Sequence, residues 1–273
     1  MLGLPGVAAA LLLKLTVREP PRTGAQQAKA PTLGETVRSL GGKASFWHTA
    51  FGGALISFVG YGSSQFLVSH IVRNYDLGAT LPQEVANASY AFGLIAGVST
   101  ALGTFLGGYL ADRLASRHKH VLSWLPALGM AFAVPLYALS FIQTEFIWAF
   151  AFLLLAPIAH YLYLGPMYAV TQGVATPRTR ATATAVLLLI VNLIGYGLGP
   201  PFVGAANDWF AANILAGSGI TLDQCADAAN AAVCAGADAE GLRYVLITLL
   251  VVLVWAALHF LLAGRTLLKD RTV

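Results

Sequence analysis

Six long apolar stretches, almost free of charged residues, dominate this sequence. They run approximately over residues 46–72, 85–109, 121–142, 146–174, 182–203 and 242–262. Each is long enough to cross a hydrocarbon core of ~30 Å as a helix that rises about 1.5 Å per residue. The stretches therefore predict an all-α membrane protein with six transmembrane helices.

Composition and charge limit the possible surroundings and partners. The chain is 57% hydrophobic and only 10% charged, which lies outside the range of soluble globular domains. Its basic residues are scattered between apolar stretches and form no basic patch with interleaved aromatic residues. We therefore expect a lipid bilayer around the chain and no nucleic-acid partner.

The distribution of positive charge predicts the orientation. Fourteen of the sixteen Lys and Arg residues precede the first stretch, follow the sixth, or lie in the connections after the second and fourth. The opposite side carries only Arg73 and Arg243. Because positive charge is retained on the cytoplasmic side, we expect a multi-pass protein of a cell inner membrane with both termini in the cytoplasm.

The remaining segments complete the predicted domain plan. Residues 1–17 begin with an apolar run that is too short to span a membrane, and their positive charge follows that run. We therefore interpret them as the tail of a truncated transmembrane helix, with an anchor on the membrane surface as the alternative. Residues 18–44, rich in Pro, Gly, Gln and Lys, are expected to form a cytoplasmic linker. The six-helix bundle is expected over 45–264 with a long outer loop at 207–241, followed by a cytoplasmic tail at 265–273.

The two cysteines, Cys225 and Cys234, both fall in the expected outer loop. Outside the inner membrane is oxidising, so a disulfide between them is predicted, with two free thiols as the alternative. The histidine pair His118 and His120 lies in a basic connection, where solvation is favoured over metal binding. We therefore expect no metal site and no cofactor.

Polar and aromatic residues inside the apolar stretches are the candidates for function. Tyr61, Ser64 and Gln65 share one face of the first helix, and two prolines with a glycine interrupt the fourth helix around His160. Hydroxyl, amide and imidazole groups within a membrane need protein partners or a water-filled cavity. Lining a substrate path is favoured, with helix-to-helix hydrogen bonding as the alternative, and His160 fits a satisfied buried histidine nearly as well.

None of the six stretches carries an acidic or basic residue near its middle. Proton and sodium relays normally use such a residue. If transport is coupled to an ion, we expect its titrating carboxylate to lie outside this chain, unless His160 or His70 takes that role.

A short run between the second and third helices carries the most specific pattern. From Gly107 to His120 it reads Gly-Gly-Tyr-Leu-Ala-Asp-Arg-Leu-Ala-Ser-Arg-His-Lys-His. It resembles the G-x-L-A-D-R-x-x-x-R/K loop that major facilitator transporters carry between the second and third helices of each six-helix half. The run from Gly195 to Gly204 is similar to the G-x-x-x-G-P-x-x-G run of the same family. The resemblance covers nearly the whole chain and implies the C-terminal half of a major facilitator fold.

Three shorter runs resemble bacterial Spinster-type transporters: Leu-Thr-Val-Arg-Glu-Pro ending at Pro20, Pro-Arg-Thr-Arg-Ala-Thr-Ala beginning at Pro177, and Leu-Arg-Tyr beginning at Leu242. This resemblance implies secondary-active transport of an amphiphile, a lysolipid or sphingosine-like lipid, by alternating access. A major facilitator drug or organic-anion exporter is the first alternative. An intramembrane enzyme or the membrane domain of an ATP-driven pump is the second, but we expect no enzyme because the sequence lacks a nucleophile or metalloprotease motif.

The family resemblance also implies site residues and a partner. The expected amphiphile site is formed by the mid-depth polar residues of the first, fourth and fifth helices: Tyr61, Ser64, Gln65, His160, Tyr161, Tyr163, Asn192 and Tyr196. The expected conformational gate consists of Gly108, Asp112, Arg113, Arg117 and Arg180. Since such transporters bind substrate between two halves, we expect a missing N-terminal six-helix half, with a second copy of the chain as the alternative.

Overall fold

The computed structural model describes residues 3–17 and 31–272, and the side chains from residue 6 onward within those ranges. The chain divides into two units, residues 1–32 and 33–273. In the first unit, α1 (Gly3–Thr16) is exposed along its described length. The expected linker at 18–44 lies partly outside the described residues, and it is not wholly irregular, because α2 (Leu33–Gly41) forms within it.

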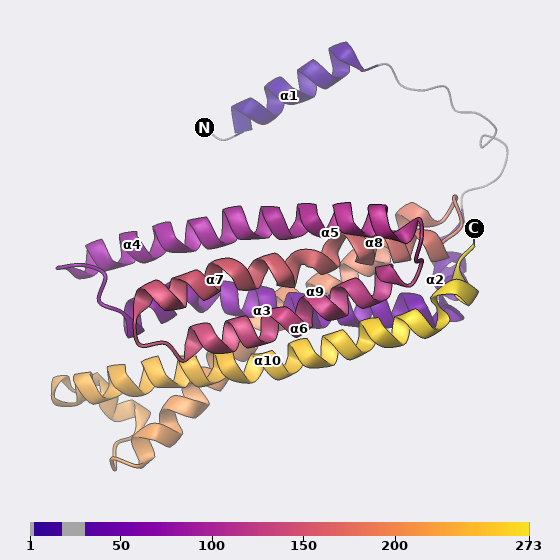
Figure 1. The fold of residues 1–273 in the computed structure, drawn as a ribbon. Helices are drawn as coiled ribbons and strands as arrows, with labels where there is room; N and C mark the ends of the chain where they lie inside the picture. Colours follow the sequence, from indigo (N-terminus) through magenta and orange to yellow (C-terminus); the bar gives the residue numbers. More distant parts are fainter. Residues whose placement is uncertain (1–2, 18–30, 273) are drawn as a thin grey trace. The chain divides into compact units, whose positions relative to one another are not determined.

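The second unit is an up-and-down bundle of helices (Figure 1). Its elements after α2 are α3 (Ala44–Asn74), α4 (Leu81–Leu94), η1 (Ile95–Ser99), α5 (Thr100–Ala115), α6 (Val121–Phe141), α7 (Phe146–His160), η2 (Tyr161–Tyr163), α8 (Leu164–Val174), α9 (Arg180–Ala216), η3 (Leu222–Ala226), η4 (Ala228–Asn230) and α10 (Ala231–Asp270).

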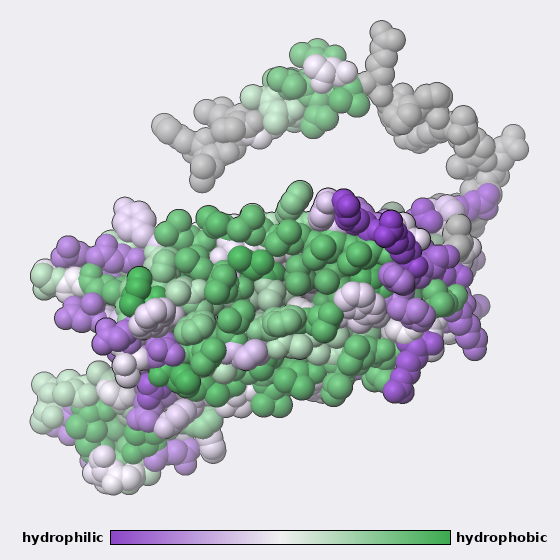
Figure 2. Space-filling view, viewed as in Figure 1, coloured by the Kyte–Doolittle hydropathy of each residue, from purple (hydrophilic) through white to green (hydrophobic). Residues whose placement is uncertain are grey.

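Six helical segments among the described residues are long and apolar enough to cross a membrane, which confirms the predicted all-α membrane fold. Apolar side chains cover the middle of the bundle and hydrophilic ones gather at both ends (Figure 2). The chain is therefore a multi-pass membrane protein.

The expected outer loop at 207–241 is largely helical, which corrects the domain plan. α9 continues to Ala216 and α10 begins at Ala231, so a helical hairpin replaces most of the loop. Both extensions are rich in alanine, the strongest helix former. The turn comes at Gly217 to Gly219, where Gly219 adopts a positive φ of 71° that a side chain would disfavour. The expected tail is also helical as far as Asp270.

Close helix contacts in the bundle depend on glycine. A Cβ added to Gly103 would lie 2.6 Å from the Ile158 carbonyl oxygen, so α5 packs directly on the backbone of α7. A Cβ added to Gly199 would lie 2.6 Å from the Phe58 carbonyl oxygen, so α9 approaches α3 in the same way. Small residues permit this approach where lipid removes the hydrophobic drive between helices. The contacts pair α5 with α7 and α9 with α3 at backbone distance.

Polar contacts at one end of the bundle join the beginning of α3 to the end of α10. The Asp270 carboxylate, 5% exposed, accepts hydrogen bonds of 2.8 Å from both the backbone N–H and the hydroxyl of Ser45. Lys43 Nζ donates to the Asp270 carbonyl at 2.8 Å. The Thr272 hydroxyl donates to the Ala175 carbonyl at 3.0 Å, which adds the end of α8 to this set. The carboxylate thus serves as a cap for α3 that is supplied from the other end of the chain.

At the opposite end a second set of polar side chains joins α3, α9 and α10. Arg73 forms an ion pair of 2.8 Å with Asp238. The Asn207 amide donates to the same carboxylate at 2.6 Å. These contacts lie at the base of the helical hairpin, whose far turn is closed by the Cys225–Cys234 disulfide with Cα atoms 5.8 Å apart.

Candidate functional site

The fourth membrane-spanning segment changes its helical form at the residues that the sequence singled out. α7 ends at His160, η2 covers Tyr161–Tyr163 as a short 3-10 helix, and α8 begins at Leu164. Pro166 has no N–H to donate to the Leu162 carbonyl, so the regular α-helical pattern cannot continue through this turn. The predicted interruption therefore lies at the row of aromatic and imidazole side chains.

The second membrane-spanning segment is also irregular, which the sequence did not predict. Between α4 and α5, the π-helix η1 (Ile95–Ser99) inserts a wider turn. Ile95, Ala96 and the following Thr100 face a cavity on the side of α7. Single π turns are frequent at functional sites, and here the turn places small and polar groups opposite the break in the fourth segment.

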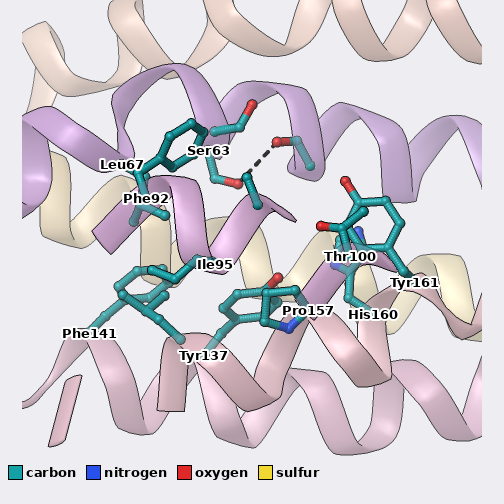
Figure 3. A pocket seen from close by; sticks show the side chains of 14 residues that line it. Ser63, Leu67, Phe92, Ile95, Thr100, Tyr137, Phe141, Pro157, His160 and Tyr161 are labelled. Atoms are coloured by element: carbon teal, nitrogen blue, oxygen red, sulfur yellow. Dashed lines mark hydrogen bonds between the residues drawn. The ribbon is translucent and has the colours of Figure 1, made fainter. Parts of the chain in front are cut away.

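Two adjoining cavities lie at this level of the bundle. The first, of about 70 Å³, lies between α3, α4, η1, α5, α6, α7 and η2 and is shown in Figure 3. Its lining consists of Gly60, Ser63, Ser64, Leu67, Phe92, Ile95, Ala96, Thr100, Tyr137, Phe141, Leu153, Pro157, His160 and Tyr161. The second, of about 260 Å³, is lined by Ile56, Ser57, Gly60, Tyr61, His160, Tyr161, Tyr163, Leu164 and Tyr168. Gly60, His160 and Tyr161 belong to both linings.

His160 separates the two cavities. Its side chain is 2% exposed, and its ring lies 5.1 Å from the ring of Tyr161 and 5.9 Å from that of Tyr137. A Cβ added to Gly60 would lie 3.5 Å from His160 Nε2, an ordinary van der Waals distance, so the imidazole packs against α3 at this glycine. His160 Nδ1 is buried and has no hydrogen-bond partner among the described residues. A buried polar atom without a partner has a desolvation cost, and a ligand that entered the cavity could remove that cost.

The cavities offer polar groups within a largely apolar surface but no charged side chains among the described lining residues. The hydroxyl groups of Ser57 and Tyr163 lie 3.4 Å apart in the lining of the second cavity, and the rings of Tyr61 and Tyr196 meet edge to face at 5.4 Å. Among the described residues that line them, neither cavity includes an Asp, Glu, Lys or Arg. Such a surface offers apolar area together with a few hydrogen-bonding groups.

The structure brings together most, but not all, of the predicted site residues. Tyr61, His160, Tyr161 and Tyr163 line the second cavity, and Ser64 lines the first. Three predicted residues line neither cavity. Tyr196 contacts Tyr61 at the margin and is 59% exposed, and Gln65 is exposed. The Asn192 amide donates to the Leu188 carbonyl of its own helix.

Three cavity residues of interest were not among the predicted site residues. Ser57 lies one turn before Tyr61 on the polar face of α3, and Tyr168 lies two turns after Tyr161. Helical spacing could have placed both of these residues beside the predicted ones. Tyr137 belongs to α6, and only the packing of α6 against α7 brings it to the cavity.

The residues of the predicted gate do not form one contact network in this conformation. Gly108 packs on α8, where a Cβ added to Gly165 would lie 2.8 Å from its Cα. Arg113 donates to the Tyr109 hydroxyl at 2.9 Å, and Arg180 Nε donates to the Gln172 carbonyl at 3.1 Å. Arg117 is exposed in the turn after α5.

Asp112 is exposed on the last turn of α5 and has no ion pair or hydrogen bond to its side chain among the described residues. Arg180, a member of the same expected gate, donates to Gln172 instead and forms no ion pair with Asp112 in this conformation.

Comparison with known proteins places this arrangement in a family. The family model described as Major Facilitator Superfamily matches residues 1–200. An "MFS-type efflux pump" of Mycolicibacterium smegmatis is 31% identical over 166 residues, which cover 61% of this chain and 37% of that protein. "Protein spinster homolog 1" of Homo sapiens is 26% identical over 217 residues, 74% of this chain and 41% of that protein. The chain therefore spans about two fifths of the length of these curated relatives.

Solved structures show the same fold over nearly the whole chain. A bacterial homolog to the human lysosomal transporter Spinster, in an inward-facing and unoccupied conformation, matches with a TM-score of 0.78 and 36% identity, covering 99% of this chain and 59% of that one. The same type of protein in an inward-facing and occupied conformation matches with a TM-score of 0.74 and 35% identity, covering 99% and 58%. The Spinster-type resemblance is thus confirmed. Because the family model covers well over half of the chain, the chain belongs to the Major Facilitator Superfamily, a family of membrane transporters and not of enzymes.

Proposed function

We propose that this chain provides one six-helix half of a secondary-active transporter that moves an amphiphilic small molecule, most specifically a lysolipid or sphingosine-like lipid, by alternating access. The observation that carries the proposal is the pair of adjoining cavities around His160. Their tyrosine, serine and imidazole groups lie beside the break in the fourth segment, as expected for transporter sites near interrupted helices.

The chemistry of the lining supports an amphiphile. Tyrosine rings offer apolar contact area for a hydrocarbon chain, and their hydroxyls can pair with a headgroup. The unpartnered Nδ1 of His160 offers a further hydrogen-bonding position inside the lining. No Asp, Glu, Lys or Arg among the described lining residues would pair with a molecule of net charge, so the lining favours an amphiphile whose headgroup carries no net charge, as a zwitterionic lysolipid does.

Exposed aromatic side chains support a second six-helix unit as partner. Tyr61 is 38% exposed and Tyr196 is 59% exposed, at the edge of the second cavity. Gln65 and Asn192 are also exposed on the same two helices, α3 and α9. We propose that a further six-helix unit, whether an N-terminal half or a second copy, covers these residues and completes the site, which would also explain why Gln65 and Asn192 line no cavity in this chain alone.

A photoactivatable lysolipid tests the substrate class without requiring transport. The purified chain in lipid nanodiscs is labelled, digested with chymotrypsin and mapped by mass spectrometry. We expect labelling between His160 and Tyr168 that unlabelled lysolipid displaces. His160→Ala and Tyr163→Ala should each weaken displacement at least about fivefold, equivalent to ~1 kcal/mol.

Tyr90→Ala is the matched control, because Tyr90 is 75% exposed on α4 and lines neither cavity. Labelling spread evenly over lipid-exposed residues, and equal in His160→Ala, would contradict the proposal. Displacement by a rigid aromatic drug but not by lysolipid would instead favour a drug exporter, the second candidate suggested by the M. smegmatis relative.

We also propose that both termini and the α5–α6 turn face the cytoplasm of a cell whose inner membrane holds the protein. Support comes from the positive residues, of which fourteen of sixteen belong to one predicted side. In intact cells, an impermeant maleimide should label Ser218→Cys, in the turn after α9, and leave Ser116→Cys unlabelled. Labelling of Ser116→Cys from outside would reverse the proposed topology.

A further inference from the structure

A groove on the outside of the bundle, separate from the central cavities, combines positive charge with an apolar floor. Two adjoining cavities of about 610 and 320 Å³ lie where the α5–α6 turn meets the last turns of α10. We call this the cationic groove, and its lining consists of Ser116, Arg117, His118, Lys119, His120, Ser123, Trp124, Leu261, Gly264, Arg265 and Leu268. The two cavities share His120 and Trp124.

The groove is built by specific contacts between α6 and α10. His120 Nδ1 lies 3.2 Å from the Gly264 carbonyl oxygen, which joins the start of α6 to α10. A Cβ added to Gly264 would lie 3.1 Å from the Ser123 Cβ, so this glycine allows α10 to pass close to α6. Leu261, Arg265 and Leu268 follow one another at helical spacing and form the α10 wall.

Several independent features of the groove favour an anion. Arg117, Lys119 and Arg265 line it, and no acidic residue occurs among its described lining residues. α6 begins here without a side-chain cap or an acidic residue in its first turn, so no side chain of that turn offsets the positive end of the helix dipole, although the backbone N–H groups of Val121 and Ser123 donate to the carbonyls of His118 and His120. Ser123, in the wall, is 2% exposed, and its hydroxyl has no hydrogen-bond partner among the described residues.

The remaining features favour a lipid as the source of that anion. Next to the cations, the groove continues along the partly buried indole of Trp124 and the exposed side chain of Leu261. These two residues border the apolar belt, the apolar middle part of the bundle surface. Figure 2 shows hydrophilic side chains gathered at this end of the bundle, directly beside that belt. A soluble anion would use only the charged part, whereas a phospholipid would place its phosphate among the cations and an acyl chain along the indole.

We propose that the cationic groove binds one anionic phospholipid of the surrounding leaflet, with its phosphate between Lys119, Arg265 and the start of α6. This site lies outside the cavities of the proposed transport path and does not depend on the transported substrate. Its occupant would hold the α5–α6 turn against α10 from the membrane side.

Quenching of tryptophan fluorescence by brominated lipids tests this directly. The full chain is reconstituted in phosphatidylcholine vesicles that contain dibrominated phosphatidylglycerol or dibrominated phosphatidylcholine at equal mole fraction. The difference between the wild-type chain and Trp124→Phe isolates Trp124 from the other four tryptophans. We expect the Trp124 component to be quenched several-fold more strongly by the anionic lipid.

Charge variants distinguish lipid binding in the cationic groove from attraction to the overall surface charge of the protein. Lys119→Gln/Arg265→Gln should reduce the preference for the anionic lipid by about fivefold per cation removed. The control Arg38→Gln/Arg178→Gln removes two exposed cations that do not line the groove and should leave the preference unchanged.

Three outcomes would overturn the proposal. Equal quenching by both lipids in the wild-type chain would show that no anionic lipid is preferred at Trp124. An equal loss of preference in both double variants would assign the effect to net surface charge. Abolition of the preference by soluble glycerol phosphate, at an ionic strength matched with chloride, would assign the groove to a free phosphate ester instead of a lipid.

Discussion

Adjacent glycines in α5 provide a sharp test of how the bundle is packed. A Cβ added to Gly107 would lie 2.6 Å from the Leu162 carbonyl oxygen and 2.8 Å from the Leu162 Cα. A Cβ added to Gly108 would meet nothing within 4 Å in the described residues. Both positions lie within the same helix, so Ala at either one gains the same helix propensity, about 0.8–1.0 kcal/mol relative to Gly.

The two substitutions should therefore differ by the strain term alone. The atoms that Gly107→Ala would meet are backbone atoms of η2, which cannot turn aside as a flexible side chain would. Overpacking of this kind costs about 1–3 kcal/mol. We expect Gly107→Ala to be less stable than Gly108→Ala by that amount, with Gly108→Ala at or slightly above the wild-type stability.

Equilibrium unfolding in mixed detergent micelles, followed by helical circular dichroism, measures this difference. A second variant, Gly165→Ala, tests the neighbouring approach of α8 to α5, because its Cβ would lie 2.8 Å from the Gly108 Cα. Equal stability of Gly107→Ala and Gly108→Ala would refute the close packing of α5 on the backbone of η2. In that case the packing of α5 on η2 would not be what positions Tyr161, a residue of η2, at the cavities.

Three further substitutions test other parts of the structure. Asp270→Asn should destabilise the bundle by about 1–2 kcal/mol in the same unfolding assay, because Ser45 loses a charged cap at the start of α3; an unchanged midpoint would contradict the cap. Cys225→Ser/Cys234→Ser should increase proteolysis of the helical hairpin between α9 and α10, since closing this short loop contributes roughly 2–3 kcal/mol in the chain-entropy model; equal cleavage with and without reductant would argue against that contribution. Asp112→Asn should leave stability within about 0.5 kcal/mol, as expected for an exposed residue, yet change cysteine accessibility at the end of the bundle that holds the α5–α6 turn if the residue acts as a gate; unchanged accessibility would remove that role.

Much of the fold could be predicted because its causes are local. Exclusion of unpaired backbone groups from lipid makes long apolar stretches helical, so all six membrane-spanning segments were predicted from the sequence. The interruption near His160 was also predictable, because Pro166 removes a backbone donor whatever surrounds it. Local hydrophobicity was misleading at 207–241, where alanine-rich helices continue beyond the apolar stretches.

The candidate site could be predicted only in part, because a cavity is formed by faces of different helices. Tyr61 and His160 were identified from polarity within apolar stretches, whereas Tyr137 became a cavity residue only through the packing of α6 against α7. Similarly, the sequence placed Asp270 in a charged tail, and only the tertiary structure places it on Ser45 at the far end of the chain. The sequence by itself determined the number and approximate position of the helices and the interruption of the fourth segment, since these follow from each segment's own chemistry. The tertiary structure decided which helix faces meet, and therefore which side chains share a cavity, because those contacts depend on backbone approach between residues far apart in the chain.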